Sequence, residues 1–97
     1  MMKDPVTKEA FERAILATIT SLYALAIDSA DVMSVRIEYS SSMKILNVII
    51  FSATTTEHAH NIVLLDDKQA LKDLLAIEDD LIERIAARRD ELDKGEA

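Results

Sequence analysis

One stretch decides the fold: Lys44-Ile45-Leu46-Asn47-Val48-Ile49-Ile50-Phe51-Ser52-Ala53, the most apolar and most β-branched part of the chain. Branched and aromatic side chains favour a strand because they fit a pleated, packed surface. The apolar side chains fall on two faces of that strand, Leu46, Val48 and Ile50 on one and Ile45, Ile49 and Phe51 on the other. A strand that is apolar on both faces needs cover on both faces. The rest of the chain is therefore interpreted as the cover for this strand.

Length and composition indicate one small cytoplasmic domain, spanning residues 1–97. The chain is 49% apolar and 30% charged, which is typical of a globular protein and not of a disordered one. It has no cysteine, which excludes a disulfide framework, a thiolate nucleophile and a cysteine-based zinc site. We recognise no signal peptide and no transmembrane span, so we expect a reducing cytoplasm and no membrane partner.

The charge is acidic and unevenly distributed along the chain. The net charge is −7, which argues against direct binding of nucleic acid, because a phosphate backbone is bound by clustered Lys and Arg. Residues 1–53 carry five basic and six acidic side chains, whereas residues 54–97 carry six basic and twelve acidic ones. The acidity therefore belongs to the second half.

Hydrophobic periodicity predicts an α+β fold in the order α-β-β-(β)-α. A helix is expected over about 5–28, because Asp4-Pro5 is a good helix start and Phe11, Ile15, Ile19 and Leu22 recur at helical spacing. Strands are expected over about 32–40 and 44–55, with a third over 62–65 unless that segment leads into the last helix. The last helix is expected over about 67–93. We predict an antiparallel meander sheet with both helices packed on one of its faces.

The first hairpin is expected to turn through a four-residue loop, Ser40–Met43, because it has no glycine for a tighter turn. That loop would place Ile37 opposite Leu46 and Arg36 opposite Asn47. Glu57–Asn61 is interpreted as a second turn.

With both helices on one face, the other face of the sheet has no cover left in the chain. An exposed apolar patch of that kind usually marks an interface. We therefore expect a homodimer or higher oligomer, formed through that sheet face or through a line of small residues on the first helix that would let another helix approach closely. The interface residues predicted are Ile45, Ile49 and Phe51 on the sheet and Ala14, Ala17 and Ser21 on the helix.

The sequence carries no catalytic constellation and implies no cofactor. The three serines in the first turn have no His–Asp partners or oxyanion-hole glycines, and the single glycine, Gly95, forms no phosphate-binding loop. His58 and His60 are weak candidates for a metal site, because two residues apart on a strand they would face the same way. A solvated polar turn is the favoured interpretation of this segment.

Two features of the last helix invite a function. Glu78 lies in its apolar stripe and is predicted as a buried charge that pairs with Arg13, Arg36 or Arg89, because an unpaired buried carboxylate is costly. The opposite face is acidic and could imitate a nucleic-acid backbone; its predicted residues are Asp73, Asp79, Asp80, Glu83 and Asp90.

These observations predict a small acidic protein that is not an enzyme and that works by binding another protein, as an adaptor, chaperone or inhibitor. One alternative is an inhibitor that imitates nucleic acid through its last helix. Another is a metal-dependent enzyme or sensor around His58 and His60. In size and acidity the chain is similar to small secretion chaperones and phage accessory proteins, but no motif supports that similarity.

Overall fold

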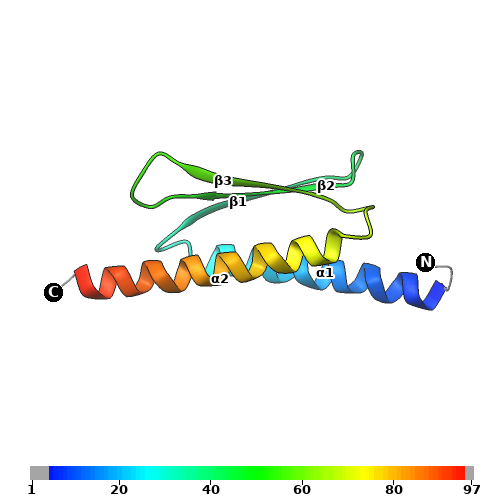
Figure 1. The fold of residues 1–97 in the computed structure, drawn as a ribbon, viewed down its shortest axis with the longest axis horizontal. Coiled ribbons are helices and arrows are strands. Elements are labelled where there is room, and N and C mark those ends of the chain that lie inside the picture. The colour runs from blue at the N-terminus through cyan, green and yellow to red at the C-terminus, as the bar shows by residue number, and fades with distance from the viewer. Residues whose placement is uncertain (1–4, 96–97) are drawn as a thin grey trace.

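The fold is a two-layer α+β sandwich, and the order of its elements is α-β-β-β-α. The computed structural model describes residues 5–95, with α1 (Pro5–Asp28), β1 (Ser34–Ser40), β2 (Ile45–Phe51), β3 (His58–Leu64) and α2 (Ala70–Gly95). The strands form one antiparallel sheet in the order β1-β2-β3. Both helices lie beneath one face of this sheet (Figure 1), as predicted, and the segment 62–65 belongs to a third strand.

β2 is the central strand of the sheet, and it supplies more of the core than either of the other strands. Leu46, Val48 and Ile50 are at most 1% exposed and face the helix layer. They pack with buried residues of both helices and of β3; the core is Ile15, Leu22, Leu46, Val48, Ile50, Val63, Ala70, Leu74, Ile77 and Leu81. The remaining β2 side chains face away from the helices and are half-buried.

The register of the first hairpin differs from the prediction by two residues. Ile37 lies opposite Val48 rather than Leu46, and Arg36 lies opposite Ile49 rather than Asn47. The loop has the expected four residues, but it spans 41–44 because Lys44 adopts a left-handed backbone conformation (φ 53°) and cannot continue the pleat. Because side chains repeat every two residues along a strand, this shift leaves every residue on its predicted face.

The interpretation of Glu57–Asn61 as a turn is wrong, because His58 begins β3. The chain turns earlier, where the Ser52 hydroxyl accepts hydrogen bonds from the backbone N–H groups of Thr54 and Thr55, both at 3.2 Å. The second strand accordingly ends at Phe51 and not near 55. The polar side chains at 58, 60 and 61 are typical of a turn, so the sequence did not predict a strand here. The inward positions 59 and 63 of this strand are small or apolar. Asn61 is the exception, and its side-chain amide donates to the Val48 carbonyl oxygen (3.3 Å).

The two helices are parallel and staggered along their axes. Both run in the same direction, with α2 beginning beneath the sheet, and the first turns of α1 and the last turns of α2 extend past the sheet at opposite ends (Figure 1). The molecule is consequently elongated, with extents of 57 × 22 × 18 Å. α2 begins at Ala70, after a turn in which the Asp67 carboxylate accepts the Gln69 backbone N–H (2.7 Å). It runs to Gly95, so that the predicted span of 67–93 is displaced by two to three residues.

One side-chain bridge joins the helices near the end of their overlap. The Arg89 guanidinium donates to both carboxylate oxygens of Asp31 (3.2 and 3.3 Å) and to the Asp28 carbonyl oxygen (3.3 Å). Arg89 thereby binds the C-terminal end of α1, where backbone carbonyls lack helical partners. These hydrogen bonds hold the pKa of Asp31 below its ordinary value.

Candidate functional surfaces

The outer face of the sheet, turned away from the helices, carries a mixed but substantially apolar surface. The register places twelve side chains there: Ser34, Arg36, Glu38 and Ser40 from β1, Ile45, Asn47, Ile49 and Phe51 from β2, and His58, His60, Ile62 and Leu64 from β3. Ile62 and Leu64 are 59% and 54% exposed. No element among residues 5–95 covers this face (Figure 1).

The predicted sheet-interface residues Ile45, Ile49 and Phe51 do lie together on the outer face. They are half-buried, because the side chains of the flanking strands surround them. The exposed apolar area comes instead from Ile62 and Leu64 on the edge strand β3. Sequence reasoning placed these two in a strand apolar on both sides, which was the signal available for them.

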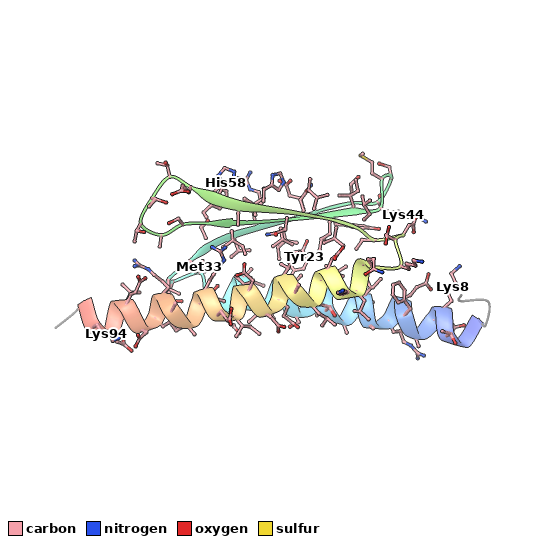
Figure 2. The ribbon with its side chains drawn as sticks, viewed as in Figure 1. Lys8, Tyr23, Met33, Lys44, His58 and Lys94 are labelled. Carbon is pink, nitrogen blue, oxygen red and sulfur yellow. The ribbon has the colours of Figure 1, made fainter. Side chains whose placement is uncertain are left out.

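His58 and His60 project from β3 onto the outer face, and His58 points away from the helices (Figure 2). The His58 ring lies beside Phe51, with ring centroids 5.6 Å apart. Across the described part of the chain, no group of three His, Cys, Asp or Glu side chains converges in a way that could hold a metal ion. The two histidines therefore have no third ligand, and their place on the sheet is that of surface residues next to an aromatic ring.

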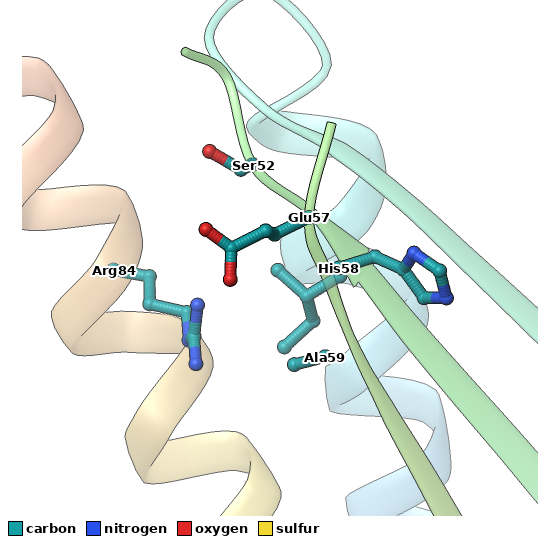
Figure 3. A pocket seen from close by; sticks show the side chains of 6 residues that line it. Ser52, Glu57, His58, Ala59 and Arg84 are labelled. Atoms are coloured by element: carbon teal, nitrogen blue, oxygen red, sulfur yellow. The ribbon is translucent and has the colours of Figure 1, made fainter. Parts of the chain in front are cut away.

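A small hollow of about 180 Å³ lies between the end of β3 and α2, lined by Ile50, Ser52, Glu57, His58, Ala59 and Arg84. The side chains of Glu57 and Arg84 enter it from opposite sides, and His58 turns away from it (Figure 3). Arg84 donates to the carboxylate of Asp80 (2.8 Å), and the Ser52 hydroxyl accepts the turn hydrogen bonds described above. Arg84 and Ser52 are thus engaged in local structure, and the described residues of the hollow show no nucleophile hydrogen-bonded to a base.

The acidic face of α2 is partly neutralised by its own helix. Asp80 pairs with Arg84, and Asp90 pairs with Lys94 (3.1 Å), both at the four-residue spacing that brings side chains together on a helix. Asp73, Asp79 and Glu83 are exposed. Two of the five predicted carboxylates therefore face the solvent with a cation beside them, which reduces the likeness to a phosphate backbone.

Glu78 is half-buried, not enclosed. Its neighbour Ile77 takes the core position at only 8% exposure. Of the expected cationic partners, Arg89 bonds Asp31 instead, and the described residues show no ion pair to Glu78. The predicted apolar stripe of α2 included the buried Leu74 and Leu81 but was wider than the buried face, because Leu75 and Ile82 lie on the exposed flank of the helix.

The small-residue line of α1 does not form one buried seam. Ala14 and Ser21 are half-buried, whereas Ala17 is exposed. The more exposed apolar surface lies on another flank of α1. Leu16 is 63% exposed and Ile27 is 73% exposed, with the partly exposed ring of Tyr23 between them.

Two apolar grooves run between this flank of α1 and β1, and they share Tyr23. One, of about 370 Å³, is lined by Leu16, Ile19 and Tyr23 with Tyr39 of β1 and Leu65. The other, also about 370 Å³, is lined by Tyr23 and Ile27 with Val35 and Ile37. Tyr23 rises from α1 toward the sheet (Figure 2). Sequence spacing held a signal for this flank, because positions 16, 20, 23 and 27 follow the heptad spacing of a helix-packing seam.

By length and composition, Thr7–Asp28 of α1 is apolar enough to cross a membrane. A mostly buried core helix and an N-terminal signal sequence pass the same test, and here the helix lies against a sheet and a second helix with 17% of its apolar window buried. The expectation of no membrane partner stays a prediction. Comparisons of the chain with protein-family models, with curated proteins and with solved structures found no match.

Proposed function

We propose that this protein works by binding another protein, without catalysis, and that the outer face of its sheet is the binding surface. The observation that carries the proposal is the apolar outer face, where Ile62 and Leu64 are more than half exposed and where no described element provides cover. Contiguous apolar surface rimmed by polar groups is characteristic of protein–protein contact sites.

The surface also indicates the chemistry of the partner. Arg36, His58 and His60 border the apolar side chains, and Glu38 lies beyond Arg36 on β1. The outer face therefore suits an aliphatic segment flanked by carboxylates, with each carboxylate near a cationic or hydrogen-bonding neighbour. An adaptor, a chaperone or an inhibitor would use such a surface in the same way.

The test is site-specific photo-crosslinking in cells of the source organism, with the photoreactive residue at position 62 and a matched control at Ala86 on α2. The proposal expects a discrete crosslinked protein from position 62 that is absent from position 86. The same crosslink should disappear in the Leu64→Asp variant, because a charge on this face would be buried without a partner. Equal crosslinking from both positions, or a crosslink that survives Leu64→Asp, would contradict the proposal.

The nucleic-acid-mimic alternative predicts a different outcome in the same assay. Reversal of charge at Asp79, Asp80 and Glu83 would abolish partner binding if the acidic face were the binding surface. If the outer face is the binding surface, the reversed protein keeps its crosslink at position 62, and its binding changes little with salt.

A further inference from the structure

We propose that two copies of this chain associate through the side of the molecule formed by β1 and α1, with the two β1 strands pairing antiparallel about a two-fold axis at Ile37. This inference concerns self-association and is independent of the proposed function of the outer face. It differs from both surfaces that the sequence suggested for an oligomer.

The first observation is that β1 presents open hydrogen-bonding groups at its edge. The Leu65 N–H donates to the Lys44 carbonyl oxygen (2.9 Å), and the Ser52 N–H donates to the Glu57 carbonyl oxygen (3.0 Å). Both bonds join even-numbered residues on the β2 side to β3. Because bonded and non-bonded pairs alternate along an antiparallel ladder, the odd-numbered residues of β2 bond to β1.

The odd-numbered residues of β2 lie opposite the even-numbered residues of β1, from Ser34 to Ser40. The backbone N–H and C=O groups of Val35, Ile37 and Tyr39 therefore point away from β2, toward the open edge. No strand within residues 5–95 pairs with that edge. An open edge of this kind is a template for another strand.

The second observation is that the charges of β1 are self-complementary in one register. Pairing about Ile37 sets Arg36 of each copy opposite Glu38 of the other, at a position without ladder hydrogen bonds, where side chains approach most closely. The same register bonds Ile37 to its own equivalent and Val35 to Tyr39 of the other copy. A two-fold axis at Arg36 or at Glu38 would instead oppose like charges, which is destabilising. Charge thus selects one register among those that the open edge permits.

The third observation is the exposed apolar flank beneath this edge. Leu16, Tyr23 and Ile27 of α1, together with the 57% exposed Tyr39 of β1, border the two grooves. A two-fold axis at Ile37 brings the same flank of a second copy against them, because both copies present α1 on the same side of the joined sheet. Strand pairing and helix contact would then exclude water from the same patch.

The area available also favours this side over the outer face. Stable dimers bury about 800 Å² per partner. The outer face, three strands about 4.8 Å apart and about 20 Å long, offers only about 300 Å² in projection. The β1–α1 side includes the edge of the sheet and the flank of α1, whose 24 residues are about 36 Å long. Its projected area is therefore about 500 Å², and the side chains that protrude from it add to the area that can be buried.

The experiment is a charge exchange at the β1 edge, followed by light scattering behind a sizing column over a dilution series. The proteins are wild type, Arg36→Glu, Glu38→Arg, an equimolar mixture of these two variants, and the variant carrying both substitutions. Lys68→Glu and Glu83→Arg are the matched controls, because they make the same changes of net charge at exposed positions far from β1. Within residues 5–95, Arg36 and Glu38 form no ion pair that either substitution would break, and thermal melts check that each monomer folds.

Wild type should be dimeric. Each single variant should raise the dimer Kd by about tenfold or more, because two attractive pairs become two repulsive ones. The mixture and the double variant should regain the wild-type Kd, whereas the controls should not change it. A monomeric wild type, single variants with an unchanged Kd, or a mixture that fails to recover would each overturn the proposal.

Two further outcomes would show that the β1–α1 side does not contact a second copy of the chain. If Ile62→Asp dissociates the dimer and Arg36→Glu does not, the second copy lies on the outer face and the β1 proposal is wrong. If the wild-type protein floats with phosphatidylcholine vesicles, the α1 flank faces lipid, and the proposal is likewise overturned. The vesicle outcome does not bear on crosslinking at position 62, whereas in the first outcome position 62 would crosslink to a second copy of the chain and not to another protein. Failure of this proposal is therefore distinguishable from failure of the proposed function.

Discussion

Replacing Ile50 by Ala tests the two-faced character of the sheet most directly. Ile50 is 1% exposed and belongs to the core between the sheet and the helices. Truncating a buried Ile to Ala costs about 2–5 kcal/mol, from the lost transfer free energy and from the cavity that remains. For a domain whose total stability is about 5–15 kcal/mol, that is a large fraction.

The matched control is Ile62→Ala, at an exposed position on the opposite face of the same sheet. It makes the same chemical change and the same loss of strand propensity, which is at most about 1 kcal/mol. Because Ile62 is 59% exposed, we expect a cost below about 1 kcal/mol from lost burial. The difference between the two variants, about 2–4 kcal/mol, therefore measures burial beneath the sheet.

The assay is urea unfolding of both variants, followed by circular dichroism, with the midpoint and slope fitted separately. At about 4–8 °C per kcal/mol, the Ile50 variant should also melt about 8 °C or more below the Ile62 variant. Equal and small costs for the two substitutions, or a larger cost at position 62, would refute the assignment of inner and outer faces. An equal and large cost at both positions would show that a further layer covers the outer face in solution.

Three other substitutions test local features. Arg89→Gln should lower the melting temperature at neutral pH and have less effect in acid. The depressed pKa of Asp31 contributes stability above the unfolded value of 3.8, and that contribution is lost as pH falls through the folded pKa. A pH series of melts on both proteins measures the difference, and a pH-independent difference would contradict the Arg89–Asp31 ion pair. Ser29→Ala should leave stability unchanged or raise it by about 1 kcal/mol, because the Ser29 hydroxyl is buried and has no hydrogen-bond partner among the described residues; a clear loss in urea unfolding would contradict that view. Lys44→Gly should raise the free energy of unfolding by up to about 1 kcal/mol, because glycine adopts the left-handed conformation at φ 53° without steric cost. The exposed ion pair of Lys44 with Asp66, at 3.7 Å, contributes little stability that the substitution could remove. A lower unfolding midpoint in urea would contradict the left-handed conformation at position 44.

The sequence predicted the architecture well because the decisive signals are periodic. The sequence of β2 predicted two apolar faces, and one of them, formed by Leu46, Val48 and Ile50, is buried against the helices. The first helix was predicted at 5–28 and spans Pro5–Asp28. Signals of this kind depend on side-chain alternation, which survives an error in register.

The errors lie where local chemistry competes with periodicity. The hairpin register depended on which residue takes the left-handed backbone conformation. That residue is Lys44, and lysine has no preference for this conformation that the sequence could reveal. β3 was shortened because His58, His60 and Asn61 resemble turn residues, although the first two are outward positions of an edge strand. The buried face of α2 was predicted too wide because the helix carries more apolar residues than that face can accommodate, and Leu75 and Ile82 are exposed. The exposed flank of α1 escaped detection for the same reason, since an apolar helix does not reveal which of its sides is covered.

The charge distribution supplies an independent reason for two copies to meet at the β1–α1 side. Each chain carries a net charge of −7, so that association must overcome mutual repulsion. Most of that charge comes from residues 54–97, which form β3 and α2. In the sheet order β1-β2-β3, with α1 against β1 and α2 against β3, these elements lie on the side opposite the β1 edge.

Contact through β1 and α1 therefore joins the nearly neutral halves of two chains and keeps the two acidic helices apart. Across the width of both sheets they would be separated by more than the Debye length of about 8 Å at physiological ionic strength. Contact through α2 would instead bring the two acidic halves together. Added salt should accordingly weaken the dimer if β1 and α1 form the contact, because it screens the Arg36–Glu38 pairs, and should tighten a dimer formed through α2. The same light-scattering series, repeated at low and high salt, separates the two arrangements.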